Sequence, residues 1–326
     1  MKKAILLSLI TYLIFAFSHQ VNSQTISNEL VKKHLFTLAD DYMEGRKAGT
    51  EGAEKAAQYI ESEFERIGLT TFDGAASYRQ NFKGKGLDLF NIIGVLEGKS
   101  KKDEYVIISA HYDHLGIEKG VKGDSIYNGA NDNASGVAAV LALAAYFKEK
   151  NNNERSILFV GFTAEELGLV GSNYFGTTIN PEKIIAGINI EMIGKESSYG
   201  PKTAWLSGFD RSNFGKMVQK NVEGTGYTIH PDPYFPKFNL FFRSDNAALA
   251  FLGVPAHTFS TSPPDDKDYH KVSDEAETLN IENIAETIRV IAIGTSSFID
   301  GTDTPSRIQI SDEERKQFEK MLKRVR

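Results

Sequence analysis

The sequence predicts an α/β domain built around a largely parallel sheet. Short runs of β-branched and other apolar residues alternate along the chain with longer runs of helical periodicity, which is typical of strands connected by helices. The runs over residues 156–162 and 184–190 are almost continuously apolar, as expected of strands buried on both faces of a sheet. Beyond residue 23 no internal repeat or low-complexity linker interrupts this alternation. We therefore expect a single domain over residues 24–326.

Residues 1–23 are expected to be a secretory signal peptide that precedes the domain. Two lysines come before an apolar run over residues 4–17, and small residues precede a cleavage position expected between Ser23 and Gln24. The alternative is an uncleaved membrane anchor, but the apolar run is short of the roughly 20 residues that a span needs. We expect export to the periplasm or the exterior of a bacterium, without a stable membrane anchor.

The elements of the domain follow from local patterns in chain order. Apolar residues at helical spacing predict a helix over residues 51–67, which Gly68 ends. Strands are expected where short apolar runs occur, over residues 89–96, 105–110, 156–162, 184–190, 204–207 and 255–260. Helices are expected over an Ala-rich run with Ser135 as its N-cap and over two runs near the end of the chain, namely residues 135–148, 281–298 and 312–325. The charged C-terminal helix, about residues 311–326, could belong to the domain or be a loosely docked tail.

Composition excludes several kinds of site. The chain has 326 residues, 37 Lys and Arg against 43 Asp and Glu, and no cysteine. Without cysteine there is no disulfide, no thiolate metal site and no cysteine nucleophile. Any metal must be held by histidine, carboxylate, main chain or water. The net charge of −6 argues against a nucleic-acid partner bound through a basic surface.

Two clusters of candidate catalytic residues follow predicted strands. His111 comes directly after one strand, and Asp113 is placed two residues on to accept the imidazole N–H and fix its tautomer. Glu165 and Glu166 follow the strand over residues 156–162, where one carboxylate could bind a metal while its neighbour serves as a general base. Taken alone, the first cluster is equally consistent with a polar turn, and the second fits a solvated helix start better than a site.

Three further candidate metal ligands lie next to predicted strands or helices, as the first two clusters do. Asp132 precedes the Ala-rich helix, Glu191 follows a strand, and His270 lies in the loop after the last strand. The carboxyl ends of parallel strands meet at one edge of a sheet, so these side chains are expected to gather there. Two histidines and three carboxylates, with a spare Glu165, suit a pair of zinc ions bridged by one carboxylate. The pattern predicts a two-metal hydrolase.

Five motifs then occur in order along the chain, namely AHYDHLG, NGANDNASG, TAEELGLVGS, NIEMIG and DYHK. This ordered set resembles metallopeptidase family 28 of clan MH, which contains co-catalytic zinc aminopeptidases, glutamate carboxypeptidases and glutaminyl cyclases. The likeness extends from about residue 44 to about residue 274, which is most of the chain. It implies a three-layer α/β/α fold with a mixed, largely parallel central sheet of the zinc-aminopeptidase, phosphorylase/hydrolase-like type.

The resemblance also implies how the metal ligands divide between two ions. His111 and Glu191 would hold one zinc ion, while Glu166 and His270 would hold the other. Asp132 would bridge the two ions, next to a cis peptide. One motif departs from the family, because Glu191 stands where Asp is usual. A single zinc ion per chain therefore remains open beside the expected two.

Three further roles are implied by the resemblance. Glu165 would be the general base that activates water and then protonates the leaving amine. Tyr269 would stabilise the oxyanion of the tetrahedral intermediate, and Asp113 would orient His111. His114 could add a ligand but better fits a supporting or surface position. Arg243 could bind a carboxylate or be an ordinary surface arginine.

The function expected from these residues is that of a secreted zinc aminopeptidase acting on peptides. One alternative is a glutaminyl cyclase-like transferase with one zinc ion on the same fold. A second alternative is a non-catalytic binding module that has lost the site, although every ligand position and the base are filled. Side-chain preference, the end of the peptide that is cleaved and the oligomeric state are left open by the sequence.

Overall fold

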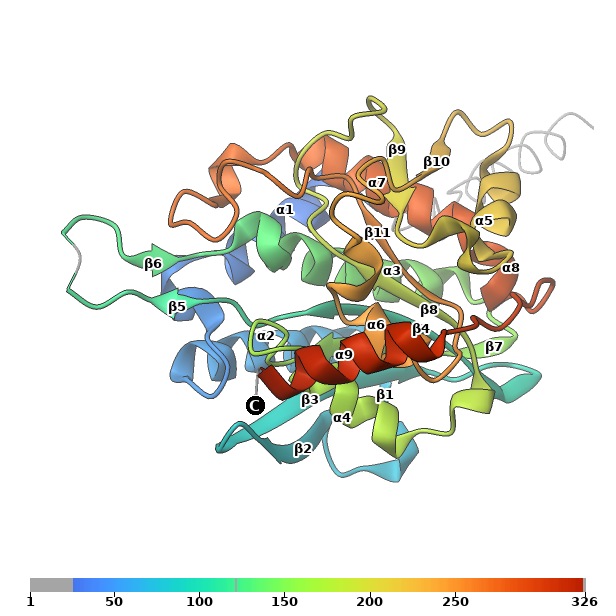
Figure 1. Cartoon of the computed structure of the whole chain (residues 1–326), viewed down its shortest axis with the longest axis horizontal. Coiled ribbons are helices and arrows are strands. Elements are labelled where there is room, and N and C mark those ends of the chain that lie inside the picture. The colour runs from blue at the N-terminus through green and yellow to red at the C-terminus, as the bar shows by residue number, and fades with distance from the viewer. Residues whose placement is uncertain (1–25, 121, 325–326) are drawn as a thin grey trace, which may run out of the picture.

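A mixed sheet lies between helices on both of its faces in the computed structural model, which describes residues 26–120 and 122–324 (Figure 1). The predicted signal peptide, residues 1–23, lies outside the described residues. The strands of the main sheet are β1 (Thr70–Thr71), β2 (Arg79–Gly84), β3 (Leu87–Leu96), β4 (Lys101–His111), β7 (Arg155–Phe162), β8 (Ile184–Ile190), β9 (Thr203–Leu206), β10 (Thr228–Pro231) and β11 (Ala256–Ser260). The helices are α1 (Asn28–Leu38), α2 (Glu51–Ile67), α3 (Ser135–Lys150), α4 (Val170–Thr178), α5 (Phe214–Val222), α6 (Asn246–Ala250), α7 (Ile281–Gly294), α8 (Ser296–Ile299) and α9 (Asp312–Arg324).

The centre of the sheet is parallel and its margins are mixed. The strand order is β1-β3-β7-β4-β8-β11-β9-β10, with β2 paired to β3. Strands β7, β4, β8 and β11 run parallel to one another, whereas β3 pairs antiparallel with β7 and β9 pairs antiparallel with β11. This arrangement confirms the predicted α/β class and its mixed, largely parallel sheet. It also brings the carboxyl ends of four strands to the same edge.

Two apolar clusters hold the layers together. Helices α1, α2, α3 and α7 pack with one face of the sheet in the largest cluster, and α3 is buried almost all round because its sequence is apolar on every side. On the other face, Phe175 of α4 and Leu249 of α6 pack against Ile107, Leu158 and Val160. The sheet is therefore covered on both faces, which explains the continuous apolar runs of its central strands.

Several local expectations need correction. Ser135 is the first helical residue of α3 rather than its N-cap, and its hydroxyl donates to the carbonyl of Asn131 instead. The run predicted as one helix over residues 281–298 divides at Thr295 into α7 and α8. The structure also contains α1, α4, α5 and β2, which the sequence patterns did not predict.

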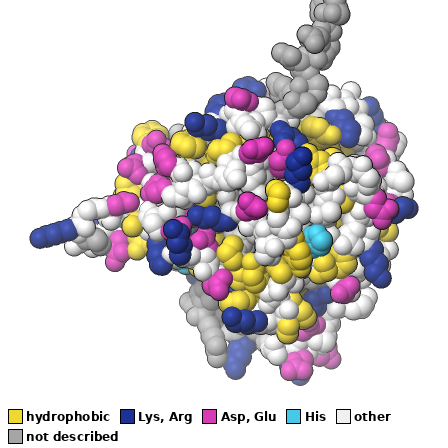
Figure 2. All heavy atoms as spheres, turned by 90° about the horizontal axis from the view of Figure 1, so that it is seen from above, with side chains coloured by type: hydrophobic (Ala, Val, Ile, Leu, Met, Phe, Trp, Pro, Cys, Tyr) yellow, Lys and Arg dark blue, Asp and Glu magenta, His cyan; other side chains and the backbone are white. Residues whose placement is uncertain are grey.

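The surface carries both signs of charge. On the face shown in Figure 2, lysine and arginine side chains lie interspersed with aspartate and glutamate around a group of apolar side chains. A two-stranded hairpin of β5 (Gly116–Ile117) and β6 (Ile126–Tyr127) projects from the body of the domain (Figure 1). None of the described helices combines the length and the apolar character that crossing a bilayer requires.

The C-terminal helix α9 lies against the domain. The ring of Phe318 stacks on Phe251 with centroids 3.8 Å apart, and Phe318 is buried. Arg211 reaches Glu314 at 2.6 Å. A charged helix of this kind is held by one buried aromatic side chain, one ion pair and a hydrogen bond from Arg315 to the carbonyl of Phe251, rather than by a wide apolar face.

Replacing Phe318 with Ala should therefore release α9. The lost burial and stacking should lower the free energy of unfolding by about 3 kcal/mol, measured by urea denaturation followed by circular dichroism. Glu319→Ala removes an exposed neighbour on the same helix and should change it by about 0.5 kcal/mol or less. Equal stability of the two variants would show that α9 does not stabilise the domain.

Candidate metal centre

The predicted ligands gather at the carboxyl edge of the central strands. His111 is the last residue of β4, Glu191 directly follows β8, and Glu166 lies in the turn after β7. Asp132 lies in the short helical segment Ala130–Ala134 before α3, and His270 lies in the loop after β11. Parallel pairing of β4 with β7 and β8 fixes these strand ends side by side.

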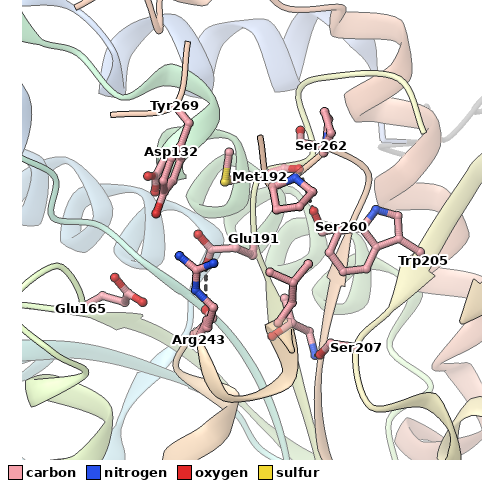
Figure 3. Close-up of a pocket in the computed structure, with 15 residues that line it drawn as sticks. Asp132, Glu165, Glu191, Met192, Trp205, Ser207, Arg243, Ser260, Ser262 and Tyr269 are labelled. Carbon is pink, nitrogen blue, oxygen red and sulfur yellow. Dashed lines mark hydrogen bonds between the residues drawn. The ribbon is translucent and has the colours of Figure 1, made fainter. Parts of the chain in front are cut away.

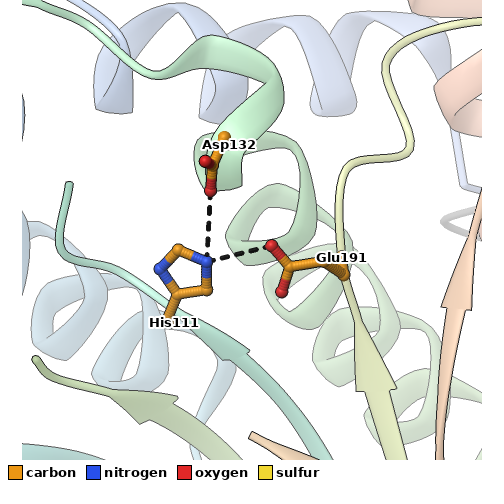
Figure 4. Close-up of side chains that lie close together, drawn as sticks. All are labelled: His111, Asp132 and Glu191. Carbon is orange, nitrogen blue, oxygen red and sulfur yellow. Dashed lines mark hydrogen bonds and ion pairs between the residues drawn. The ribbon is translucent and has the colours of Figure 1, made fainter. Parts of the chain in front are cut away.

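The first group consists of His111, Asp132 and Glu191. His111 Nε2 lies 3.1 Å from Glu191 Oε1 and 3.3 Å from Asp132 Oδ1 (Figure 4). Ligand bonds of about 2.0–2.1 Å in tetrahedral geometry place ligand atoms roughly 3.3 Å apart. The three side chains therefore have the chemistry and the spacing of a zinc site.

The second group contains Asp132, Glu166, His270 and also His114. His270 Nε2 lies 3.1 Å from Asp132 Oδ2 and 3.2 Å from Glu166 Oε2. His114 Nδ1 lies 2.9 Å from Glu166 Oε1 and 3.8 Å from Asp132 Oδ2. Asp132 thus directs one oxygen to each group, which is the arrangement of a bridging carboxylate.

His114 is more central than the sequence suggested. Its side chain is fully buried, which excludes a surface position. Its ring nitrogen lies within 4.8 Å of carboxylate oxygens of Asp132 and Glu166, close enough for the three to hold one metal ion. Its spacing in the His-Tyr-Asp-His run was the available signal. That signal does not show on its own whether the second histidine turns toward the metal groups or away from them.

Histidine side chains offset part of the carboxylate charge within the two groups. Burial alone would raise the pKa of Asp132, but hydrogen bonds from His111 and His270 hold it well below its usual range. Burial likewise opposes a charge on His270, yet Asp132 and Glu166 raise its pKa to about 10. Protonated imidazoles therefore compensate the carboxylates, and a cation bound between them would displace these protons.

Glu165 lies beside both groups and lines a cavity together with Asp132 and Glu191 (Figure 3). Burial raises the pKa of Glu165 well above its usual value, and the nearby carboxylates of Glu166 and Glu191 raise it further. Tyr269 lines the same cavity and stacks on His270, with ring centroids 3.9 Å apart. Burial followed by the nearby carboxylates raises the pKa of Tyr269, so its hydroxyl stays protonated and can donate.

Asp113 contacts His111 as predicted, but through its main chain. The contact to His111 Nδ1 is made by the main-chain carbonyl of Asp113 at 3.1 Å, while its carboxylate is 3.8 Å away. The carboxylate instead accepts hydrogen bonds from the main-chain N–H groups of Glu165 at 3.0 Å and Glu166 at 3.4 Å. A main-chain acceptor is available to any residue at position 113, whereas the carboxylate itself fixes the Glu165–Glu166 turn.

The Oε2 atom of Glu191, the oxygen that does not face His111, is held by two hydrogen bonds. Ser244 Oγ donates to Glu191 Oε2 at 2.7 Å, and Asn133 Nδ2 donates to the same oxygen at 3.2 Å. The other oxygen remains turned toward His111. These contacts accommodate the longer side chain of glutamate where the family usually has aspartate.

The loop of Asp132 is fixed by residues that sequence reasoning missed. The Asp274 carboxylate accepts the main-chain N–H groups of Asn131 at 2.9 Å and Asp132 at 3.0 Å. Buried Arg46 donates to the carbonyls of Asn128 and Gly129 at 2.6 and 2.9 Å. The Asp132–Asn133 peptide is cis, as the resemblance implied. A buried arginine is hard to identify from sequence, because most arginines lie at the surface.

Comparison with known proteins shows to which family the chain belongs. The family model described as "Peptidase family M28" matches residues 91–293. Aminopeptidase YwaD of Bacillus subtilis is 30% identical over 138 residues, which cover 39% of this chain and 28% of that protein. Leupeptin-inactivating enzyme 1 of Streptomyces exfoliatus is 29% identical over 297 residues, covering 84% of this chain and 63% of that protein. The chain spans less than two-thirds of the length of these relatives.

Solved structures show the same fold at low identity. A zinc aminopeptidase from Bacillus subtilis superposes with a TM-score of 0.67 at 15% identity, covering 84% of this chain and 95% of that one. Porphyromonas gingivalis glutaminyl cyclase superposes with a TM-score of 0.66 at 16% identity, covering 84% and 99%. These likenesses confirm the predicted fold type. Because the match to the family model covers more than half of this chain, the chain belongs to peptidase family M28.

Proposed function

We propose that this protein is a zinc aminopeptidase that removes N-terminal residues from peptides. The observation that carries the proposal is the sharing of Asp132 between two ligand groups, with Glu165 beside them in one cavity. Two relatives, one named an aminopeptidase and the other a leupeptin-inactivating enzyme, support it. The choice of the N-terminal end rests on these relatives.

His111, Asp132 and Glu191 would hold one zinc ion, and Asp132, Glu166 and His270 would hold the other. Zinc at these positions would polarise the scissile carbonyl and lower the pKa of a bound water. The four carboxylates at this edge, including Glu165, would be offset by two dications, which favours two ions per chain over one.

Glu165 would take a proton from the attacking water and deliver it to the leaving amine. Burial, which raises the pKa of Glu165, favours its protonated form and so supports the transfer of a proton to the leaving amine. Asp113 would position Glu165 by holding the main chain of its turn. The protonated hydroxyl of Tyr269 would donate to the oxyanion that develops on the substrate carbonyl.

The two alternatives differ in what they require of this site. A glutaminyl cyclase with one zinc ion would not need the first ligand group, yet His111, Asp132 and Glu191 lie at zinc-ligand spacing. A binding module would not need a general base, yet Glu165 is in place. The peptidase is the function that uses every one of these side chains.

We also propose that the protein is exported, with residues 1–23 removed between Ser23 and Gln24. The support is the order of basic, apolar and small residues in this segment. An exported enzyme without cysteine would depend on its apolar core rather than on disulfides for stability.

The proposed activity is tested with a panel of aminoacyl p-nitroanilides, alongside a peptide with N-terminal glutamine. We expect release of free amino acids, loss of activity after chelation and recovery on addition of zinc. Conversion of the glutamine peptide to pyroglutamate without hydrolysis of the panel would favour the cyclase. Absence of both reactions in zinc-loaded protein would favour the binding module.

Replacing Glu165 with Gln should abolish turnover while leaving the metals bound. Loss of the proton acceptor should lower kcat by roughly 10²- to 10⁴-fold, measured beside the zinc content of the purified variant. Glu166→Gln is the matched control and should lose zinc, because it removes a proposed ligand. The reverse pattern of zinc loss would exchange the roles of these neighbours.

The number of ions can be counted on purified protein. We expect two zinc ions per chain by atomic absorption, and one in Glu191→Ala because Asp132, Glu166 and His270 remain. Exposed Glu196 lies five residues away, and Glu196→Ala should keep both ions. A single ion in the unmodified protein would mean that Glu191 does not complete the first site.

A further inference from the structure

We propose that Arg243 selects substrates that present a carboxylate to the cavity, an inference that rests on the proposed peptidase function. Arg243 follows the 3₁₀ turn Leu240–Phe242 and lines the cavity that also contains Asp132, Glu165 and Glu191 (Figure 3). It is the only lysine or arginine among the described residues that line this cavity. A substrate that enters the cavity therefore meets a single positive side chain beside the metal ligands.

The guanidinium of Arg243 has no partner within the described chain. No hydrogen bond or ion pair joins its side chain to a described residue, although three carboxylates line the same cavity. Every other arginine whose side chain the structure describes is engaged, as Arg46 is by carbonyls and Arg79 by Glu54 and Glu61. Arg243 is thus the exception in a structure that otherwise pairs its arginines.

The main chain of Arg243 is held by hydrogen bonds, even though its guanidinium group has no partner among the described residues. Its N–H donates to the carbonyl of Leu240 at 3.0 Å, and the next residue, Ser244, is tied to Glu191 at 2.7 Å. The base of the side chain is therefore anchored to the metal centre, while the guanidinium remains exposed. An anchored arginine needs little reorganisation to receive a ligand.

The chemistry of the cavity indicates what this ligand would be. A guanidinium presents a planar fork of donors that matches a carboxylate in a bidentate pair. The carboxylates of the site would be offset by the proposed metal ions, which leaves Arg243 to attract an additional anion. The remaining walls combine apolar side chains with hydroxyl groups, among them Trp205, Leu240, Met192, Ser207 and Thr258. A short apolar body with a carboxylate fits this lining.

A peptide can supply such a carboxylate in two ways. It can be the side chain of an N-terminal Asp or Glu, or it can be the C-terminal carboxylate of a dipeptide. Both have the same chemistry at Arg243, so the experiment separates them. The first arm compares glutamyl and glutaminyl p-nitroanilide, and the second compares Leu-Gly with its C-terminal amide.

We expect the wild-type, zinc-loaded enzyme to prefer the carboxylate member of one pair. Arg243→Gln should lower kcat/KM for that member by roughly 10- to 100-fold, as for loss of a charge-assisted hydrogen bond, and should leave its neutral counterpart within about twofold. Arg243→Lys should retain part of the preference. Lys237→Gln removes the same charge from the exposed part of the preceding loop, outside the cavity lining, and should retain all of it.

Binding provides a readout that does not depend on turnover. Calorimetric titration of the same four compounds into zinc-loaded Glu165→Gln should show the same preference, and adding Arg243→Gln should remove it. Equal use and equal binding of both members in both pairs would overturn the inference while leaving the peptidase intact. If the wild type hydrolysed none of the compounds, the proposed function would fail, and the titrations would then decide the role of Arg243 alone.

Discussion

The convergence of four carboxylates at one edge of the sheet is the constraint on which the rest of the site depends. Asp132, Glu165, Glu166 and Glu191 lie in a partly or fully buried region, where like charges repel strongly unless they are compensated. Histidines interleave with them and carry raised pKa values, so the polypeptide supplies part of the compensation itself. Divalent cations would supply the rest, and this need accounts for the spacing of the ligand atoms.

The residues around the four carboxylates hold the main chain of the turns that carry them, and not only their side chains. Asp113 and Asp274 use their carboxylates to hold the peptide N–H groups of the two turns that carry Glu165, Glu166 and Asp132. Arg46 holds the preceding loop through carbonyl oxygens. These hydrogen bonds restrain the main chain of both turns and so favour the spacing of the carboxylates that the turns carry.

The sequence patterns identified ligand candidates on strand ends and, with the family motifs, Asp132 and His270 in loops, but they did not identify the loop residues that support these ligands. His111, Glu166 and Glu191 were predicted because the carboxyl ends of parallel strands meet at one edge, and β8 has the predicted bounds. The burial of His114 and the support from Asp274 depend on how loops distant in sequence fold over that edge. Asp113 contacts His111 as expected, but residue spacing does not distinguish a side-chain acceptor from the main-chain carbonyl of the same residue.

The proposed metal ligands and the proposed substrate selectivity come from different parts of the fold, but both involve the loop before α6. The proposed ligands lie at or beyond the carboxyl ends of the central strands and before α3, whereas much of the cavity wall comes from segments beyond β8. Within the loop before α6, Arg243 faces the cavity and Ser244 anchors Glu191. The next residue, Asp245, is buried, and burial raises its pKa to about 7. A glutamate at position 191 reaches Ser244 because of its longer side chain, so this substitution links the first metal group to the loop that carries the proposed selectivity.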